Sequence, residues 1–299
     1  MPLFGGIEAG GTKFICAVGS GPDELLAQAR FPTTTPEETL TRAAEFFNQF
    51  MVQTQTRLHG IGIASFGPLD LDPHSPTYGF ITSTPKPGWQ NVAIRDVLLA
   101  RTGCPVVIDT DVNGAALAEG IWGSATGLSD YVYITVGTGI GGGLIVQGRP
   151  FHGLLHPEMG HIPLPHDLTK DPFPGICPFH GDCFEGLASG PALQARLGQN
   201  PETVPSNHPI WDLEANYIAL ALQTIICVVS PQRIILGGGV MQQTHLFPRI
   251  RDLTRTLLNG YIQARALLEE TDSYIVPPKL GSLTGVLGAI ALAQQASEN

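Results

Sequence analysis

The sequence predicts an α/β protein built from two related halves, on two observations. Short apolar runs typical of strands alternate with longer stretches typical of helices, which is the pattern of α/β folds. A strand, a glycine-rich turn and a second strand also occur twice, at residues 3–19 and 131–146. Two ordinary tight hairpins would give the same pattern. Two copies in separate halves nevertheless favour a duplicated architecture with one phosphate-facing loop in each half.

The other elements follow in order along the chain. Thr35, Pro36 and Glu38 form a capping box that predicts the start of a helix. Buried strands are expected in 60–70 and 105–113, and an alanine-rich helix from Gly114. The last predicted elements are a helix over 212–229, strands at 233–236 and 274–276, and a helix over 283–295.

Composition limits the class of protein. The 299 residues carry a formal charge of -10, which disfavours nucleic acid and anionic membranes as partners. Outside a central cluster, Cys16, Cys104 and Cys227 lie among apolar residues and predict buried thiols in a reducing cytosol. No signal peptide or membrane span is recognised in the sequence, so we expect a cytoplasmic protein.

The two glycine-rich turns have the groups that hold phosphate. Gly10 and Gly11 can present backbone N–H groups, Thr12 adds a hydroxyl and Lys13 adds a positive charge. The order Thr12-Lys13, followed by a strand, excludes a Walker A loop. The second turn supplies the same parts from Gly137, Thr138 and Gly139.

A four-ligand metal site is predicted near the middle of the chain. Cys177, His180 and Cys183 stand three residues apart in ICPFHGDCFEG, and His161 upstream can complete a tetrahedral zinc site. Four protein ligands leave no open position, so the zinc is expected to be structural. The alternative is that the cysteines are small apolar fillers and the histidines are solvated loop residues.

Asp109 and Asp111 lie where a predicted buried strand ends and a helix begins. Ligand groups are common at this position in α/β proteins, and one of the two carboxylates is a candidate general base. Helix capping is the alternative function for an aspartate there. The two glycine loops favour the catalytic interpretation for Asp111.

Several motifs in this order give the sequence a resemblance to the sugar kinases of the ROK family (repressor, open reading frame, kinase), and most closely to its bacterial zinc-containing fructokinases. The match runs the length of the chain. Its parts are GGIEAGGTK, PKPGWQN, DTDVNGAALAEG, TVGTGIGGG, HPEMGH, CPFHGDC and ILGGGVM.

The resemblance implies an actin-like (ribonuclease H-like) duplicated two-domain fold with the active site in the interdomain cleft. The smaller domain would comprise 1–112 with the C-terminal helix 283–299. The larger domain, 113–282, would carry the zinc knuckle and the surface of a homodimer.

The resemblance also implies an activity, transfer of the γ-phosphate of MgATP to the 6-hydroxyl of D-fructose. Asp111 would be the catalytic base. The sugar would be bound by Glu158, His161, Glu185, Thr110, Gly88 and Trp89, with His161 also on zinc. Besides the two glycine loops, Gly237 and Gly238 would contact the adenosine side of ATP, although a plain strand-to-helix turn explains them equally well.

Some points stay open in the sequence. Trp89 is either an aromatic side chain near the sugar or a packing anchor under its loop. Many family members have Asn where this chain has Thr110, and the loss of that amide puts glucose specificity in doubt. Many also have Asp where this chain has Glu8, whose longer side chain would shift a carboxylate near Mg²⁺ to water-mediated contact. The alternatives are a kinase of mannose, glucose or N-acetylmannosamine, a catalytically inactive sugar-binding regulator, and a DNA-binding repressor. The repressor is disfavoured because the chain is acidic and because its first strand is expected within a few residues of Met1, with no room for a DNA-binding domain before it.

Overall fold

The computed structural model describes residues 2–84 and 86–298 in two compact units. Unit 1 takes its described residues from 1–127, 145–156 and 279–299, and unit 2 consists of 128–144 and 157–278. Pro85, the first residue of PKPGWQN, lies outside the described residues. The domain limits expected from the sequence stay a prediction.

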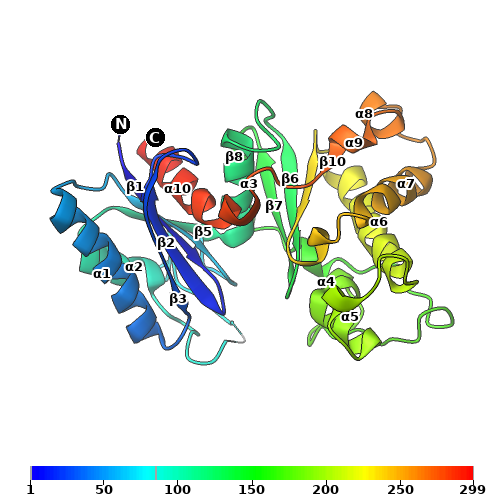
Figure 1. The fold of residues 1–299 in the computed structure, drawn as a ribbon, viewed down its shortest axis with the longest axis horizontal. Coiled ribbons are helices and arrows are strands. Elements are labelled where there is room, and N and C mark those ends of the chain that lie inside the picture. Colours follow the sequence, from blue (N-terminus) through cyan, green and yellow to red (C-terminus); the bar gives the residue numbers. More distant parts are fainter. Residues whose placement is uncertain (1, 85, 299) are drawn as a thin grey trace. The chain divides into compact units, whose positions relative to one another are not determined.

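Unit 1 contains a five-stranded mixed sheet (Figure 1). Its spatial order is β3 (Leu25–Pro32), β2 (Lys13–Gly19), β1 (Phe4–Ala9), β4 (Ile61–Ser65) and β5 (Val106–Thr110). The first three strands pair antiparallel, whereas β1, β4 and β5 pair parallel. The predicted strand, glycine turn and strand at the start of the chain is confirmed as β1 and β2.

Helices cover both faces of this sheet. On one face lie α1 (Pro36–Thr54) and α2 (Ile94–Thr102), and on the other lie α3 (Asp111–Ile121) and α10 (Thr284–Ser297) (Figure 1). The second face is unusually tight: a Cβ on Gly62 of β4 would lie 1.8 Å from Ala289 O of α10. A Cβ on Gly288 would lie 2.3 Å from the Gly114 carbonyl carbon of α3. Glycine is therefore needed for α10 to reach the sheet and α3.

A buried carboxylate fixes the segment that leads into α10. Glu119 of α3 is fully buried and accepts hydrogen bonds from the backbone N–H groups of Lys279 (3.0 Å), Leu280 (3.0 Å) and Ser124 (2.7 Å). The short 3-10 helix η4 (Gly281–Leu283) and then α10 follow directly. Glu119 thus holds the chain where it returns to unit 1.

The helix caps agree with the sequence. The Thr35 side chain accepts from the Glu38 N–H at 3.3 Å at the start of α1, as the capping box predicted. Thr110 caps α3 in the same way, accepting from the Asn113 N–H at 3.1 Å. Because of this cap α3 begins at Asp111, before the predicted start at Gly114.

The second sheet repeats the order of the first. Its strands lie in the order β10 (Ile275–Val276), β9 (Ile234–Gly237), β6 (Tyr131–Val136), β7 (Ile140–Val146) and β8 (Arg149–Pro150). In both sheets the first strand in the chain is central, with the second and third on one side and the fourth and fifth on the other. The predicted duplication is therefore confirmed.

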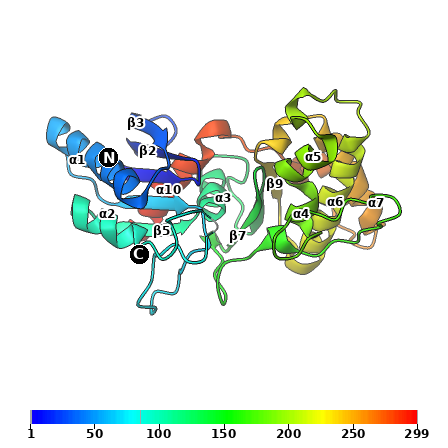
Figure 2. The ribbon, with the colours of Figure 1, turned by 90° about the horizontal axis from the view of Figure 1, so that it is seen from below.

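The helices of unit 2 include α4 (Phe184–Ala188), α5 (Gly190–Leu197), α6 (Ile210–Val229), α7 (Leu246–Leu258), α8 (Arg265–Leu268) and α9 (Thr271–Tyr274). Three short 3-10 helices accompany them: η1 (Met159–His161), η2 (Pro201–Thr203) and η3 (Val240–Gln242). Figure 2 shows α4, α5, α6 and α7 together on one side of β9. Within the described residues α6 is the one helix long and apolar enough to cross a membrane, but half of its apolar window is buried, as in ordinary core helices.

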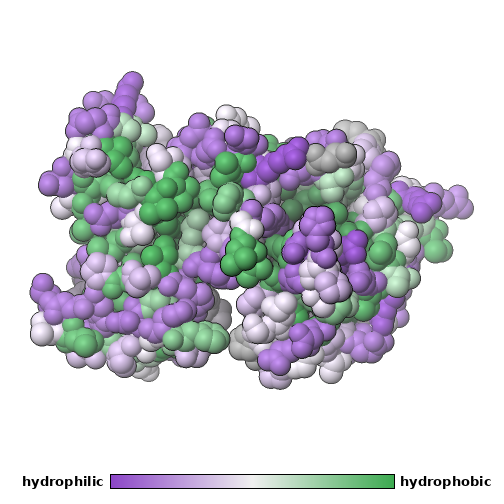
Figure 3. Space-filling view, turned by 180° about the vertical axis from the view of Figure 1, so that it is seen from behind, coloured by the Kyte–Doolittle hydropathy of each residue, from purple (hydrophilic) through white to green (hydrophobic). Residues whose placement is uncertain are grey.

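The surface corrects one prediction about cysteine. Cys16 and Cys104 are buried as predicted, but Cys227 is exposed, because the last turn of α6 leaves the core at Cys227 and Val228. The face shown in Figure 3 mixes hydrophilic and hydrophobic side chains, which is usual for a folded domain. The thiol of Cys227 therefore has access to solvent.

Candidate active site

The structure places Asp111 at the first position of α3, exposed at the end of β5. Its carboxylate accepts from the Val112 N–H at 2.9 Å. Thr110 is buried and its hydroxyl serves as the helix cap, so capping does not depend on Asp111. The position of Asp111, at the N-terminus of a helix, stabilises the ionised carboxylate that a general base requires.

Asp109, two residues earlier, has a different environment. It is buried, and its Oδ1 accepts from the Thr110 N–H and from Asn113 Nδ2, both at 2.7 Å. Its Oδ2 lies 3.0 Å from Nε2 of His152. The hydrogen bond to Asp109 raises the pKa of His152, against a smaller lowering by burial. Asp109 is thus a buried carboxylate paired with a histidine, whereas Asp111 is exposed.

The first glycine turn joins β1 to β2. The Gly10 N–H donates to Lys13 O at 2.9 Å, which closes the turn, and the Thr33 hydroxyl donates to Gly10 O at 2.7 Å. Of the two backbone N–H groups predicted to bind phosphate, that of Gly10 is therefore already engaged within the turn. A Cβ on Gly11 would meet open space, and Thr12 is exposed. Gly11 and Thr12 are the better placed of the predicted phosphate contacts.

Trp89 lies in the core of unit 1, with 0% exposure. Its Nε1 donates to Thr34 O at 2.9 Å, and its ring centroid lies 5.6 Å from those of Phe14 and Phe66. Of the two alternatives, the structure supports the packing anchor. Gly88 next to it is exposed with φ +79°, a left-handed conformation that favours glycine.

The four predicted metal ligands come together in unit 2. Nδ1 of His161 lies 3.7 Å from Cys177 Sγ and 3.6 Å from Cys183 Sγ, and Nδ1 of His180 lies 3.7 Å from Cys177 Sγ. All four ligand atoms lie within 4.8 Å of one another. Bonds of about 2.0–2.3 Å to a tetrahedral zinc ion would separate ligand atoms by about 3.3–3.8 Å. The donor set and its spacing therefore fit zinc.

Local backbone contacts bring the four ligands together. Cys177 and Gly181 exchange backbone hydrogen bonds of 3.1 and 2.9 Å, which forms the knuckle, and the Phe184 N–H donates to Ile162 O at 2.9 Å. The second bond ties the knuckle to the segment with His161. Burial raises the pKa of the Cys183 thiol to about 11, so its thiolate requires a nearby cation. Cys177 and Cys183 are both buried.

Glu185 connects the knuckle to the second glycine loop. It lies in the first turn of α4, two residues after Cys183, and its Oε2 accepts from the Ile140 N–H at 2.9 Å. A Cβ on Gly139 would lie 2.8 Å from the same oxygen, so only glycine allows this approach. Glu158, at the start of η1, is exposed, and its carbonyl accepts from the His161 N–H at 3.0 Å. Glu158 and Glu185, which were predicted to bind the sugar, therefore lie in the same short segments as the metal ligands His161 and Cys183.

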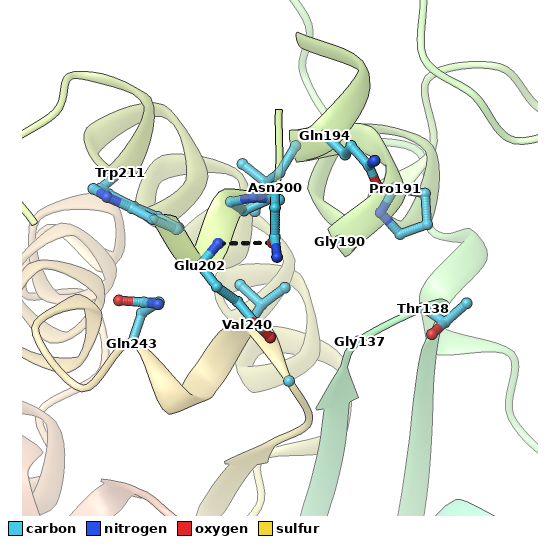
Figure 4. Close-up of a pocket in the computed structure, with 13 residues that line it drawn as sticks. Gly137, Thr138, Gly190, Pro191, Gln194, Asn200, Glu202, Trp211, Val240 and Gln243 are labelled. Carbon is cyan, nitrogen blue, oxygen red and sulfur yellow. Dashed lines mark hydrogen bonds between the residues drawn. The ribbon is translucent and has the colours of Figure 1, made fainter. Parts of the chain in front are cut away.

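A cavity of about 420 Å³ lies beside the second glycine loop (Figure 4). Gly137 and Thr138 form one wall and the start of α5, at Gly190 and Pro191, forms another. The Gly190 N–H donates to Gly137 O at 2.8 Å, so α5 begins at the loop. The other lining residues are Leu193, Gln194, Asn200, Pro201, Glu202, Trp211, Gly239, Val240 and Gln243.

The glycine turn between β9 and η3 lines this cavity, but through residues other than those predicted. Gly239 and Val240 line it, whereas Gly237 and Gly238 are not among the lining residues. A Cβ on Gly237 would lie 2.2 Å from the Tyr133 hydroxyl, and Gly238 has φ +92°. Close packing and backbone conformation explain this pair, as the strand-to-helix alternative proposed.

Sequence reasoning missed the rest of the cavity and the partner of Asp109. Asn200 and Glu202 lie at the start of η2, whereas Gln243 follows η3, and no motif or spacing in the sequence joins the two segments. His152 is separated from Asp109 in the chain by helix α3 and by strands β6, β7 and β8. Only the folded chain brings such residues together.

Comparisons with known proteins agree with this fold. Residues 4–296 match the model of the ROK family. A fructokinase from Zymomonas mobilis is 46% identical over 300 residues, covering 99% of this chain and 98% of that protein. A glucokinase from Streptomyces coelicolor is 26% identical over 331 residues, covering 99% and 98%. The crystal structure of a ROK hexokinase from Thermus thermophilus has a TM-score of 0.80 and 27% identity, covering 99% of this chain and 100% of that one.

The pair of His152 and Asp109 predicts a pH-dependent contribution to stability. The folded pKa of His152 lies above the unfolded value of about 6.5, so the pair stabilises the fold fully below that pH. This stabilisation is lost as the pH rises through the folded pKa. The loss of unfolding free energy in His152→Gln should therefore be larger at low pH than at high pH, measured by urea unfolding between about pH 5.5 and 9. His74→Gln, on an exposed loop, is the control, and an equal loss at every pH would contradict the assignment.

Proposed function

We propose an activity for this chain, which belongs to the ROK family. It is an ATP-dependent fructokinase, which transfers the γ-phosphate of ATP to the 6-hydroxyl of D-fructose. The observation that carries the proposal is the contrast in identity between two relatives that each match 99% of this chain. The chain is 46% identical to a fructokinase but 26% identical to a glucokinase. Thr110, in place of the family's asparagine, agrees with a preference other than glucose.

The cavity of unit 2 is the proposed site for the adenosine and phosphate groups of ATP. Gly137 and Thr138 lie at the N-terminal end of α5, and such an end attracts phosphate through its backbone N–H groups and dipole. Asn200, Glu202 and Gln243 supply polar groups for an adenine ring or a ribose. Gly11, Thr12 and Lys13 of unit 1 are proposed to contribute further phosphate contacts.

The sugar is proposed to bind Glu158, His161 and Glu185. Nδ1 of His161 is the nitrogen that approaches both sulfurs, so Nε2 lies on the other side of the ring. Ligation of Nδ1 by a metal would fix the tautomer and make the Nε2 N–H a reliable donor to a sugar oxygen. Zinc is proposed as this structural metal, on the donor set and spacing described above.

Phosphoryl transfer requires positioning and charge stabilisation more than covalent chemistry from the protein. Asp111 is proposed to orient the attacking hydroxyl and to remove its proton. Mg²⁺ bound with ATP would neutralise charge on the β- and γ-phosphates. We also propose a homodimer, on the family resemblance alone.

The substrate is tested with a panel of hexoses. Fructose should give the highest kcat/KM with MgATP in a coupled ADP-release assay, ahead of glucose, mannose and N-acetylmannosamine. Faster turnover of another sugar would retain a kinase and change its substrate. Absence of ADP release with every hexose would contradict the proposal.

Substitution of the proposed base tests the mechanism. Asp111→Ala should lower kcat by about 10²–10⁴-fold, because proton removal is lost in the transition state. Fructose binding, measured by calorimetry, should change by less than about tenfold, because the base acts mainly in the transition state. Asp23→Ala, exposed in the turn after β2, is the matched control. Near-normal turnover of Asp111→Ala would exclude Asp111 as the base.

Removal of the metal tests the role of the knuckle. Treatment with a chelator should weaken fructose binding and lower the melting temperature, because His161 and the start of α4 lose their anchor. ATP binding should be less affected, because Thr138 and the start of α5 are not metal ligands. If metal-free folded protein bound fructose normally, zinc would only stabilise the fold.

A further inference from the structure

A buried polar network lies behind the knuckle, in the core of unit 2. Its centre is Asp171, whose Oδ2 accepts from the Tyr217 hydroxyl at 2.6 Å and from Arg196 Nη2 at 2.9 Å. The side chains of Asp171 and Arg196 are each 7% exposed. Burial raises the pKa of Asp171, but the bonds from Tyr217 and Arg196 outweigh it, so the pKa lies below its ordinary value. A buried carboxylate is thus held ionised by two donors.

The same arginine also holds α4, the helix that carries Glu185. Arg196 Nη1 donates to Leu187 O, near the C-terminal end of α4. This helix has five residues and its N-terminus has no side-chain cap, so it depends on outside partners for its position. The Arg196 guanidinium also lies 4.2 Å from the centroid of the Phe173 ring. Asp171 and Arg196 therefore connect the loop before the knuckle to the helix after it.

His166 links this network to the knuckle itself. Its ring is 2% exposed, with Nε2 2.9 Å from Asp171 O and Nδ1 3.1 Å from Asp182 Oδ2. Asp182 stands between the metal ligands His180 and Cys183. Both ring nitrogens thus face oxygen atoms, one on the loop before the knuckle and one within the knuckle.

We propose that His166 is a positioning residue that, through Asp182 on one side and Asp171 with Arg196 on the other, holds the zinc knuckle and the helix of Glu185 in the geometry that binds the sugar. The inference rests on the proposed function, since the sugar and the zinc are both part of it. It goes beyond that function by assigning a role to residues outside the ligand set and the sugar site. Residues that orient metal ligands typically change metal affinity or activity about 10–100-fold when they are substituted.

Measurements of the melting temperature, the KM values and the loss of zinc distinguish this role from a purely structural one. A residue that only stabilises the fold would lower the melting temperature and leave the KM values of the folded enzyme unchanged. A residue that positions the knuckle and Glu185 would raise the KM for fructose and speed the loss of zinc. The KM for ATP should stay nearly constant, because the cavity for ATP is lined by other residues.

Two substitutions test the proposal in the full chain. His166→Gln removes the imidazole ring and with it the contacts to both Asp171 and Asp182. Asp182→Ala removes only the contact between His166 and the knuckle, and it leaves the bond from His166 to Asp171 in place. Asp182 is 51% exposed, so Asp182→Ala is expected to fold even where His166→Gln does not. Asp167→Ala is the control, because this exposed carboxylate belongs to the same loop and its hydrogen bonds run to Thr169.

Zinc release to a chromogenic chelator and the KM for each substrate are measured for all variants. For His166→Gln and Asp182→Ala, zinc release should be on the order of tenfold faster and the KM for fructose should rise severalfold. The KM for ATP should remain within about twofold of the parent value. The Asp167→Ala variant should resemble the parent in every measurement.

The proposal is overturned if zinc release and the KM for fructose stay at parent values in Asp182→Ala, or if Asp167→Ala changes them equally. Equal rises in the KM values of both substrates would also contradict it. Failure of the proposed function is distinct from these results, because it appears in the parent protein as missing zinc or missing hexose turnover.

Discussion

The hydrogen bond from the Ile140 N–H to Glu185 is the interaction on which the site in unit 2 depends. It joins the helix that follows the knuckle to the glycine loop beside the cavity, and a Cβ on Gly139 would lie 2.8 Å from the accepting oxygen. The carboxylate proposed to bind the sugar and the loop proposed to bind phosphate are thereby joined by a single short contact. Because the backbone amide occupies one carboxylate oxygen, Glu185 can approach a ligand in few orientations, which is the rigidity that catalysis by positioning requires.

The sequence predicted those features that depend on residues close together in the chain. The capping box at Thr35, the glycine hairpins and the ligand spacing of the knuckle all concern residues within a few positions of each other, and the structure has each of them. The family, the duplicated fold and the fructokinase assignment followed from motifs that occur in order along the chain. Their specificity came from the order, because each motif alone also fits a plain turn.

What the sequence could not predict depends on long-range packing. Trp89 stands in a motif beside exposed residues, yet its side chain fills the core between two phenylalanine rings. Gly237 and Gly238 have the residue type of a ligand loop but serve a tight packing contact and a left-handed turn. The bond from His166 to Asp182 joins a loop histidine to a residue of the knuckle, and no periodicity connects the two. In each case the deciding partner lies far away in the chain.

The return of the chain to unit 1 has a consequence for the order in which the protein folds during synthesis. Most of unit 2 lies in one continuous stretch, whereas α10 is translated after it and packs on β1 and β4, which are among the first elements made. The part of the first sheet that α10 covers, beside α3, therefore stays exposed until α10 leaves the ribosome. Unit 2 can fold before unit 1 is complete, contrary to the usual N-terminal-first order.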